Sequence, residues 1–220
     1  MRQGVATAVM LSLVCAVTAA NAAIVPIFVA NHSFESPIVT PPPDFIVGSI
    51  TGWTLSSPAD QGVFNPVTGV HYTGPGTTDG NQTAFVNAGN ISQGPLGTFL
   101  TVNTSYTLRV DVGDRLDAPF PGYRVQLLAG STLLAEEFSL TPNDGFLTST
   151  VSFSAFAGNP NLGQQVVIRL VSGGTQVNFD NVRLETDDAT PAVPVPASLA
   201  IWGIGTFGLG FIYRRRKAAK

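Results

Sequence analysis

The chain has 220 residues, of which 44% are hydrophobic and only 11% charged. It can therefore bury a sizeable core, although globular proteins usually carry about 25% charged residues. The segment between the two terminal tails contains five arginines and all fourteen acidic residues, so its net charge is −9. Such a surface repels phosphate backbones and argues against a nucleic-acid partner. The single cysteine, Cys15, lies in the first apolar run, so removal of that run leaves no thiol for disulfides or cysteine catalysis.

The first 22 residues have the three parts of a secretory signal. Arg2 precedes an apolar run over residues 5–17, and small residues follow at Ala20-Asn21-Ala22. This run is too short to span a bilayer comfortably. We therefore expect residues 1–22 to be a signal peptide that directs export; an uncleaved anchor is the alternative.

Residues 23–188 are predicted to form one all-β domain, a two-sheet antiparallel jelly-roll sandwich. Apolar and polar residues alternate most cleanly over 105–112, as in a half-buried strand. No window before the tail demands a helix, and the loop-rich stretch 38–81 is expected to pack over one end or edge of the sandwich. The expected strands are 25–34, 83–86, 98–102, 105–112, 123–127, 132–138, 146–156, 166–171 and 176–184.

The last segment, 189–220, contains a Pro-rich linker, an apolar run and a basic tail. The apolar run 197–213 would span about 25 Å as a helix, the low end for a transmembrane segment. Arg214, Arg215 and Arg216 directly follow it and are expected to hold that side in the cytoplasm. The sequence thus predicts a C-terminal transmembrane helix and an inner-membrane intermediate.

The linker ends in Val193, Pro194, Val195, Pro196 and Ala197. Together with the apolar run and the basic tail, this motif resembles the PEP-CTERM sorting signal in its VPLPA-like variant. The resemblance implies recognition by an exosortase-type membrane enzyme, removal of the tail, and release to the cell surface or extracellular matrix. A permanent single-span anchor is the alternative.

Within the domain, several short motifs follow one another in a recognisable order. It opens with Asn31-His32-Ser33-Phe34-Glu35, continues with Gly52-Trp53 and Asp79-Gly80-Asn81, and closes with Phe179-Asp180-Asn181-Val182-Arg183-Leu184. This order resembles the galactose-binding-like jelly rolls, which include many carbohydrate-binding modules. Two further motifs, Gly62-Val63-Phe64-Asn65-Pro66 and Val110-Asp111-Val112-Gly113-Asp114-Arg115, are similar to a narrower subgroup, the cyanobacterial hapalindole-type (Stig) cyclases.

The jelly-roll resemblance implies a structural calcium ion that joins the first and last strands. Asn31, Glu35 and Asp180 are the expected ligands, because calcium takes six to eight oxygens from carboxylates, carbonyls and water. In the alternative, Glu35 caps a turn and Asp180 accepts local backbone hydrogen bonds.

A sugar ligand would use aromatic platforms and polar side chains. Candidate platforms in the long loop region are Trp53, Phe64 and Tyr72; otherwise these residues pack in the core. A polar groove is expected from Arg109 and Asp111 on one strand and Arg124 and Gln126 on a neighbouring strand. The alternative is a solvated face with modest ion pairs.

No catalytic residue is expected, because neither His32 nor His71 lies in a recognisable nucleophile motif. The leading hypothesis is a non-catalytic, calcium-stabilised module that binds a glycan or exopolysaccharide at the cell surface. A structural matrix protein without a specific ligand is the second hypothesis.

The third hypothesis is a Stig-cyclase-like enzyme for a small hydrophobic substrate. It would use Asp180 as the acid, with Tyr72, Phe85 or Tyr106 sheltering a cation. The acid and calcium roles of Asp180 compete. A deep aromatic pocket around Asp180 would favour the enzyme, and a shallow polar groove would favour the binding module.

Overall fold

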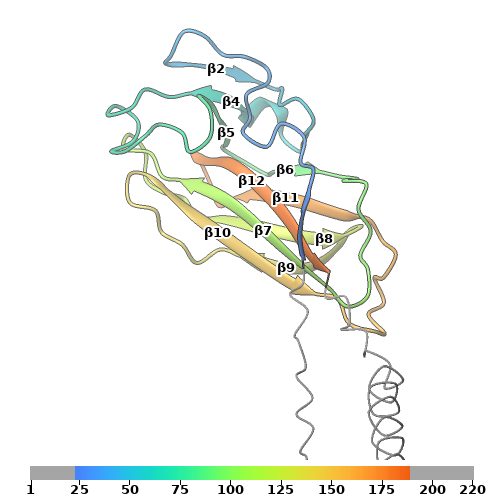
Figure 1. Cartoon of the computed structure of the whole chain (residues 1–220). Coiled ribbons are helices and arrows are strands. Elements are labelled where there is room, and N and C mark those ends of the chain that lie inside the picture. Colours follow the sequence, from blue (N-terminus) through green and yellow to red (C-terminus); the bar gives the residue numbers. More distant parts are fainter. Residues whose placement is uncertain (1–22, 189–220) are drawn as a thin grey trace, which may run out of the picture. The chain divides into compact units, whose positions relative to one another are not determined.

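Two antiparallel β-sheets pack face to face in this computed structural model, which describes residues 23–188 (Figure 1). The predicted all-β, two-sheet antiparallel sandwich is confirmed. The expected signal peptide (1–22) and the linker, sorting motif, helix and tail (189–220) lie outside the described residues. Between residues 23 and 188, no helix is long and apolar enough to cross a membrane.

The larger sheet has seven strands in the order β10-β7-β12-β5-β4-β2, and β1 pairs with the far end of β12. The longest of them, β12, pairs with three neighbours and so forms the middle of the sheet. The strands are β1 (Ala23–Ile27), β2 (Asp44–Val47), β4 (Gln61–Asn65), β5 (Thr83–Val86), β7 (Thr104–Gly113), β10 (Phe146–Ser154) and β12 (Val177–Asp188).

The smaller sheet has five strands in the order β3-β6-β11-β8-β9. They are β3 (Thr54–Leu55), β6 (Asn90–Gln93), β8 (Tyr123–Ala129), β9 (Thr132–Glu137) and β11 (Val166–Ser172). The single helical element within residues 23–188 is a 3₁₀ turn, η1 (Pro58–Asp60).

The core lies between the sheets and follows from the alternation of the sequence. On β7, Tyr106, Leu108, Val110 and Val112 point inward and are at most 1% exposed. The residues between them point to the face of the seven-stranded sheet that lies away from the five-stranded sheet, which we call the outer face. Burial of each large apolar side chain contributes about 1.5–3 kcal/mol, which fixes the register of the strand.

An irregularity in β12 determines which side chains reach the outer face. The register against β7 shifts between Asp180 and Arg183, and Asn181 has a φ of 50°. Because of this β-bulge, Phe179 and Val182 are both in the core. Asp180 and Arg183 consequently point to the outer face, one on each side of the bulge.

The strand predictions fail in short segments rich in proline, glycine or polar residues. Residues 98–102 form only one isolated bridge, between Phe99 and Gln165, and β1 ends at Ile27 instead of continuing to residue 34. Three short strands, β2, β3 and β4, lie inside the stretch that was expected to be a loop. Such strands are defined by pairing with distant neighbours, which local alternation does not reveal.

The loop between β4 and β5, residues 66–82, covers the outer face of the seven-stranded sheet, as its contacts with β10 and β12 show. We call it the covering loop. The chain divides into compact units, one of which is Ala22–Ala189. This unit has its own core and pairs all its strands internally, so it contains what a domain needs to fold independently.

Candidate functional site

Two glycines make room for aromatic rings on the outer face. Gly62 on β4 pairs with Phe85 on β5, and Gly113 on β7 pairs with Phe146 on β10. A Cβ atom at Gly62 would lie 2.8 Å from the Phe85 ring, and one at Gly113 would lie 2.6 Å from the Phe146 ring. Real Cβ atoms do not approach a ring so closely, so both rings occupy the space that the glycines leave.

An aromatic-lined cavity of about 410 Å³ opens on this face. Phe45, Phe64 and Phe85 form its aromatic wall, and the rings of Phe45 and Phe85 meet edge to face at 6.1 Å. The other lining residues are Pro43, Val47, Ala59, His71, Asn87, Arg115 and Gln176. Its volume and apolar walls are typical of sites that hold small organic ligands.

Two basic side chains contact Phe64 in the cavity wall. The Arg115 guanidinium lies 4.6 Å from the centre of the Phe64 ring, and the His71 ring meets it edge-on at 5.0 Å. Arg115 also forms an ion pair with Asp117 and donates a hydrogen bond of 3.1 Å to Gln176. The hydrogen bond from Arg115 holds the pKa of Asp117 below its usual range.

Tyr72 of the covering loop is fully buried, and its ring lies 4.7 Å from the ring of Phe146. Burial raises the pKa of its hydroxyl far above the ordinary value. The Tyr72 hydroxyl and the side-chain oxygen of Asn178 are the two buried side-chain polar atoms without a hydrogen-bond partner within residues 23–188. Buried polar groups are nearly always paired, so two orphans on one face mark it as unusual.

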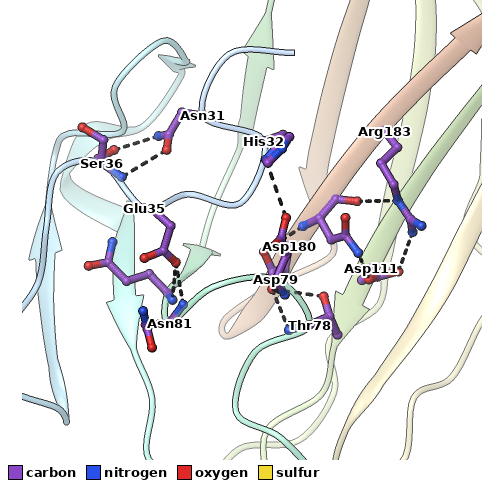
Figure 2. Close-up of polar contacts among 12 residues, drawn as sticks. Asn31, His32, Glu35, Ser36, Thr78, Asp79, Asn81, Asp111, Asp180 and Arg183 are labelled. Atoms are coloured by element: carbon purple, nitrogen blue, oxygen red, sulfur yellow. Dashed lines mark hydrogen bonds and ion pairs between the residues drawn. The ribbon is translucent and has the colours of Figure 1, made fainter. Parts of the chain in front are cut away.

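Asp180 lies on the same face and is fully buried (Figure 2). Its Oδ2 accepts hydrogen bonds from the Thr78 amide (2.8 Å), the Thr78 hydroxyl (3.0 Å) and the Asp79 amide (2.9 Å), and its Oδ1 accepts one from the Asn181 amide (2.7 Å). Burial raises its pKa from the ordinary 3.8 to about 7, although these hydrogen bonds act in the opposite direction. Asp180 can therefore hold a proton near neutral pH.

Asp180 does not line the cavity, because one row of side chains lies between Asp180 and the cavity. Thr83 pairs with Phe64 of the cavity wall and accepts a hydrogen bond from Asn178, two residues before Asp180 on β12. After burial, the charges of Arg115 and Asp180 are among the influences on the pKa of Tyr72. Along the covering loop, Tyr72 follows His71 of the cavity wall and precedes Thr78, which binds Asp180.

The expected calcium ligands are only partly brought together (Figure 2). Glu35 Oε1 accepts hydrogen bonds of 2.7 Å from the amides of Asn81 and Gln82, so Glu35 and Asp180 bind the two ends of the segment 78–82. The Asn31 side chain instead bonds to Ser36 and Thr51. Within residues 23–188, no group of three or more His, Cys, Asp or Glu side chains could hold a metal ion.

These residues therefore fit a calcium ion in part. Glu35 Oε2 makes no hydrogen bond within the described residues and remains available as an oxygen ligand. Further ligands would have to be carbonyl or water oxygens, since the Asn31 oxygen already accepts a bond from the Ser36 amide.

The expected sugar-binding residues are dispersed. Trp53 is a core residue that packs on Phe34 with 5.2 Å between the rings. Phe64 lines the cavity, and Tyr72 is a fully buried residue of the covering loop. Tyr106, a candidate for sheltering a cation, points into the core and bonds to the Phe99 carbonyl, so it cannot face Asp180.

The expected polar groove does not form. Arg109 and Asp111 are on β7 of the seven-stranded sheet, where they pair with Glu185 and Arg183. The other two residues, Arg124 and Gln126, are on β8 of the five-stranded sheet, where both bond to Glu136. The two strands belong to different sheets, so the prediction that they are neighbours was wrong.

Several residues of this face are not indicated as site residues by the sequence. Arg115 lies in a family-like motif that gives it no role by itself, and His71 lacks a nucleophile motif. Phe45, Phe146 and Asn178 gave no local signal, because their place depends on the pairing of β2, β10 and β12. Of the residues proposed from the sequence, Asp180, Phe64, Tyr72 and Phe85 do lie on this face.

The chain is thus a β-sandwich protein with a buried acid and an aromatic cavity on one sheet face. Comparisons with known proteins identify its family. The family model described as HpiC1 cyclase, HpiC1-like, matches residues 25–185. This chain belongs to the HpiC1-like cyclase family. A comparison with curated protein sequences found no match.

Solved structures of cyclases from Fischerella resemble the chain. An apo-form cyclase from Fischerella sp. is 32% identical, with a TM-score of 0.69, over 76% of this chain and 98% of its own. The Stig cyclase Fisc from Fischerella sp. TAU, in complex with (3Z)-3-(1-methyl-2-pyrrolidinylidene)-3H-indole, is 31% identical, with a TM-score of 0.68 over 76% and 100% of the two chains. A cyclase from Fischerella sp. TAU in complex with 4-(1H-indol-3-yl)butan-2-one is 32% identical, with a TM-score of 0.65 over 75% and 98%.

These findings correct the leading hypothesis from the sequence. The family and its solved members are cyclases, which are enzymes, so the expectation of a non-catalytic glycan-binding module was wrong. The resemblance to the Stig cyclase subgroup is confirmed. The predicted polysaccharide partner depended on the corrected hypothesis, and no observation tests it.

Proposed function

We propose that the domain is a cyclase that closes a ring in a small hydrophobic substrate by protonating it, with Asp180 as the acid. One observation carries this proposal: a fully buried carboxyl whose pKa is raised to about 7. A general acid works best when its pKa lies near the working pH. An ordinary aspartic acid would have lost its proton long before neutral pH.

The chemistry would proceed in three balanced steps. Through the Tyr72 hydroxyl, Asp180 gives a proton to one carbon of a substrate C=C bond, which leaves a carbocation on the other carbon and a carboxylate on Asp180. A nucleophilic ring carbon of the same substrate attacks the cation and forms the new C–C bond. The ring then loses a proton to the carboxylate, so substrate and product are isomers, and the carboxyl exchanges this proton with solvent before the next turnover.

The aromatic side chains support the same proposal. A carbocation is stabilised over the faces of aromatic rings, and Phe64, Phe85 and Phe45 form the cavity wall. Tyr72, whose hydroxyl has no partner within residues 23–188, would pass the proton between Asp180 and the cavity. The cavity of about 410 Å³ has room for a two-ring aromatic such as indole with a short side chain.

The ligands of the related cyclases favour an indole substrate. One Fischerella cyclase was solved with an indolyl butanone and another with a pyrrolidinylidene indole. We therefore propose an indole that carries an alkenyl side chain as the substrate class.

The proposal can be tested with the purified domain, residues 23–188, and indoles that carry alkenyl side chains of five or ten carbons. Liquid chromatography with mass detection should show a product of unchanged mass and different retention. Asp180→Asn should lower the rate by about a hundredfold or more. Failure of the wild-type domain to convert any member of this panel would count against the proposal.

We further propose that calcium stabilises the segment 78–82 through Glu35. The free Glu35 oxygen and the close packing of this carboxylate on Gly80 support it: a Cβ atom at Gly80 would lie 2.4 Å from Glu35 Oε1. In this assignment Asp180 keeps its proton for catalysis, and calcium takes no part in the reaction.

For the whole chain, we propose export, passage through an inner-membrane intermediate, and sorting by an exosortase-type enzyme to the cell surface or extracellular matrix. The support is the sequence of the two ends, above all Val193-Pro194-Val195-Pro196-Ala197 before an apolar run and three arginines. The membrane would be a partner through residues 197–213 until the tail is removed.

A further inference from the structure

The His71 ring presents a hydrogen-bond donor to the cavity. Its Nδ1 accepts a hydrogen bond of 3.0 Å from the Val67 amide. In a neutral imidazole one nitrogen accepts and the other carries the proton, so this bond assigns the proton to Nε2. His71 is 9% exposed, and its Nε2 is neither hydrogen-bonded nor among the fully buried polar atoms within residues 23–188. Because His71 lines the cavity, the remaining accessible N–H belongs to the cavity.

Arg115 supplies further donors beside the same ring. A guanidinium has five N–H groups, and three of them bond to Asp117 and Gln176. Two N–H groups remain without a partner among the described residues. Arg115 and His71 both contact Phe64 and both line the cavity, so the two side chains belong to the same wall.

The charge at this position favours a neutral ligand group. Asp117 forms an ion pair with Arg115 through two of its N–H groups, so the pair is close to neutral overall. A carboxylate on the ligand would meet no net positive charge and would lose its hydration. A carbonyl oxygen or an imine nitrogen needs only the donors.

We propose that the cavity selects aromatic substrates that carry a neutral hydrogen-bond acceptor, which His71 Nε2–H and the free N–H groups of Arg115 bind beside Phe64. This proposal rests on the proposed function, because it assumes that the cavity holds the substrate. His71 and Arg115 determine specificity here, and the acid remains Asp180.

The test compares two probes that differ only in the acceptor. Isothermal titration calorimetry with the domain measures the Kd of 4-(1H-indol-3-yl)butan-2-one and of 3-butylindole, which has the same ring and chain length without the carbonyl. The Kd of 3-butylindole divided by the Kd of the ketone measures the preference for the acceptor. This ratio should be about tenfold lower in the double variant His71→Phe, Arg115→Met than in the wild type. Each single change should give part of this fall.

His71→Gln is the matched control, because its amide keeps an N–H donor near the position of Nε2. This variant should keep more of the preference for the ketone than His71→Phe does. Thermal melting of every variant verifies that the fold is intact, and the ratio cancels any general loss of affinity.

The outcomes separate this proposal from the one on which it rests. If the wild-type domain converts alkenyl indoles but the ratio is the same in the double variant, the proposed function stands and the assignment of His71 and Arg115 is overturned. If neither probe binds the wild-type domain although it converts alkenyl indoles, the assignment of His71 and Arg115 is overturned and the proposed function stands. If the domain neither binds the probes nor converts alkenyl indoles, both proposals are overturned.

Discussion

Asp180 on β12 and Asp111 on β7 are directly opposite each other in the sheet register, yet only Asp111 has a cation beside it. The Arg183 guanidinium lies 3.3 Å from Asp111, and Thr148 and Asn181 also donate to this carboxylate. Asp180 is surrounded by amide and hydroxyl donors only. Two like charges opposite each other destabilise a sheet, and no cation lies beside Asp180 to offset a charge on it.

The raised pKa of Asp180 makes a prediction about stability. The folded protein holds this proton up to about pH 7, whereas the unfolded chain loses it near pH 3.8. The stabilising contribution is therefore complete below pH 3.8 and is lost as the pH rises to about 7. Because Asp180→Asn does not titrate, the free energy of unfolding of the wild type minus that of the variant should fall over this range, by up to about 4 kcal/mol.

Urea denaturation of both proteins at pH 4, 5.5, 7 and 8 measures this difference, and the subtraction removes the contributions of other titrating groups. A difference that stays constant with pH would contradict the raised pKa. A difference that increases with pH would mean that the hydrogen bonds to the carboxylate outweigh its burial.

The room that Gly113 leaves for Phe146 makes a second prediction. Gly113→Ala should lower the free energy of unfolding by about 1–3 kcal/mol, because the new methyl group forces the Phe146 ring aside. Turnover should also fall, since the Tyr72 ring packs on Phe146. Gly74→Ala is the control: its Cβ would meet nothing within 4 Å, so its stability should stay within about 0.5 kcal/mol of the wild type. Equal effects of the two changes would argue against this packing.

Much of the fold could be predicted from local pattern. The inward positions of β7 alternate strictly with polar residues, and the core contains the predicted face of that strand. The assignment of strands to sheets was beyond reach, which is why Arg109 and Arg124 were expected to share a groove. They lie on different sheets because β7 pairs with β12, a strand distant in sequence, while β8 pairs with β11.

The candidate site was predictable only where a motif carried it. Asp180 was selected because of its place in the closing motif, but its burial depends on the covering loop, whose amides come from Thr78 and Asp79. His71 and Arg115 were not selected, because neither has a chemical role until the fold brings both beside Phe64. Long-range pairing creates this face, and the sequence alone does not report it.

Calcium should raise the melting temperature of the domain if Glu35 helps to bind it. The melting temperature of the wild type should be higher in millimolar calcium than in chelator. For Glu35→Gln the difference between the two conditions should be much smaller. Asn31→Ala serves as a diagnostic: its side chain bonds to Ser36 and Thr51, so its loss should lower the melting temperature equally in both conditions. A wild-type melting temperature that is the same with and without calcium would remove calcium from the account.

Processing of the C-terminal tail tests the sorting proposal. Changing Pro194 and Pro196 to alanine should block removal of the tail, so that the full-length chain stays in the membrane fraction of an exosortase-containing bacterium. A variant with Pro41→Ala and Pro42→Ala, two prolines inside the domain, is the control and should be processed normally. Wild-type chain that keeps its tail would support the permanent anchor instead.

The transfer of a proton from Asp180 to the substrate is the central claim, and solvent deuterium tests it most directly. In D₂O the wild-type domain should convert an alkenyl indole into an isomer that carries one deuterium at the protonated carbon, at a rate that falls above pH about 7 as Asp180 ionises. Asp180→Asn should abolish this product, while Asp111→Asn should retain it. Product without deuterium, or an undiminished rate in Asp180→Asn, would contradict the account.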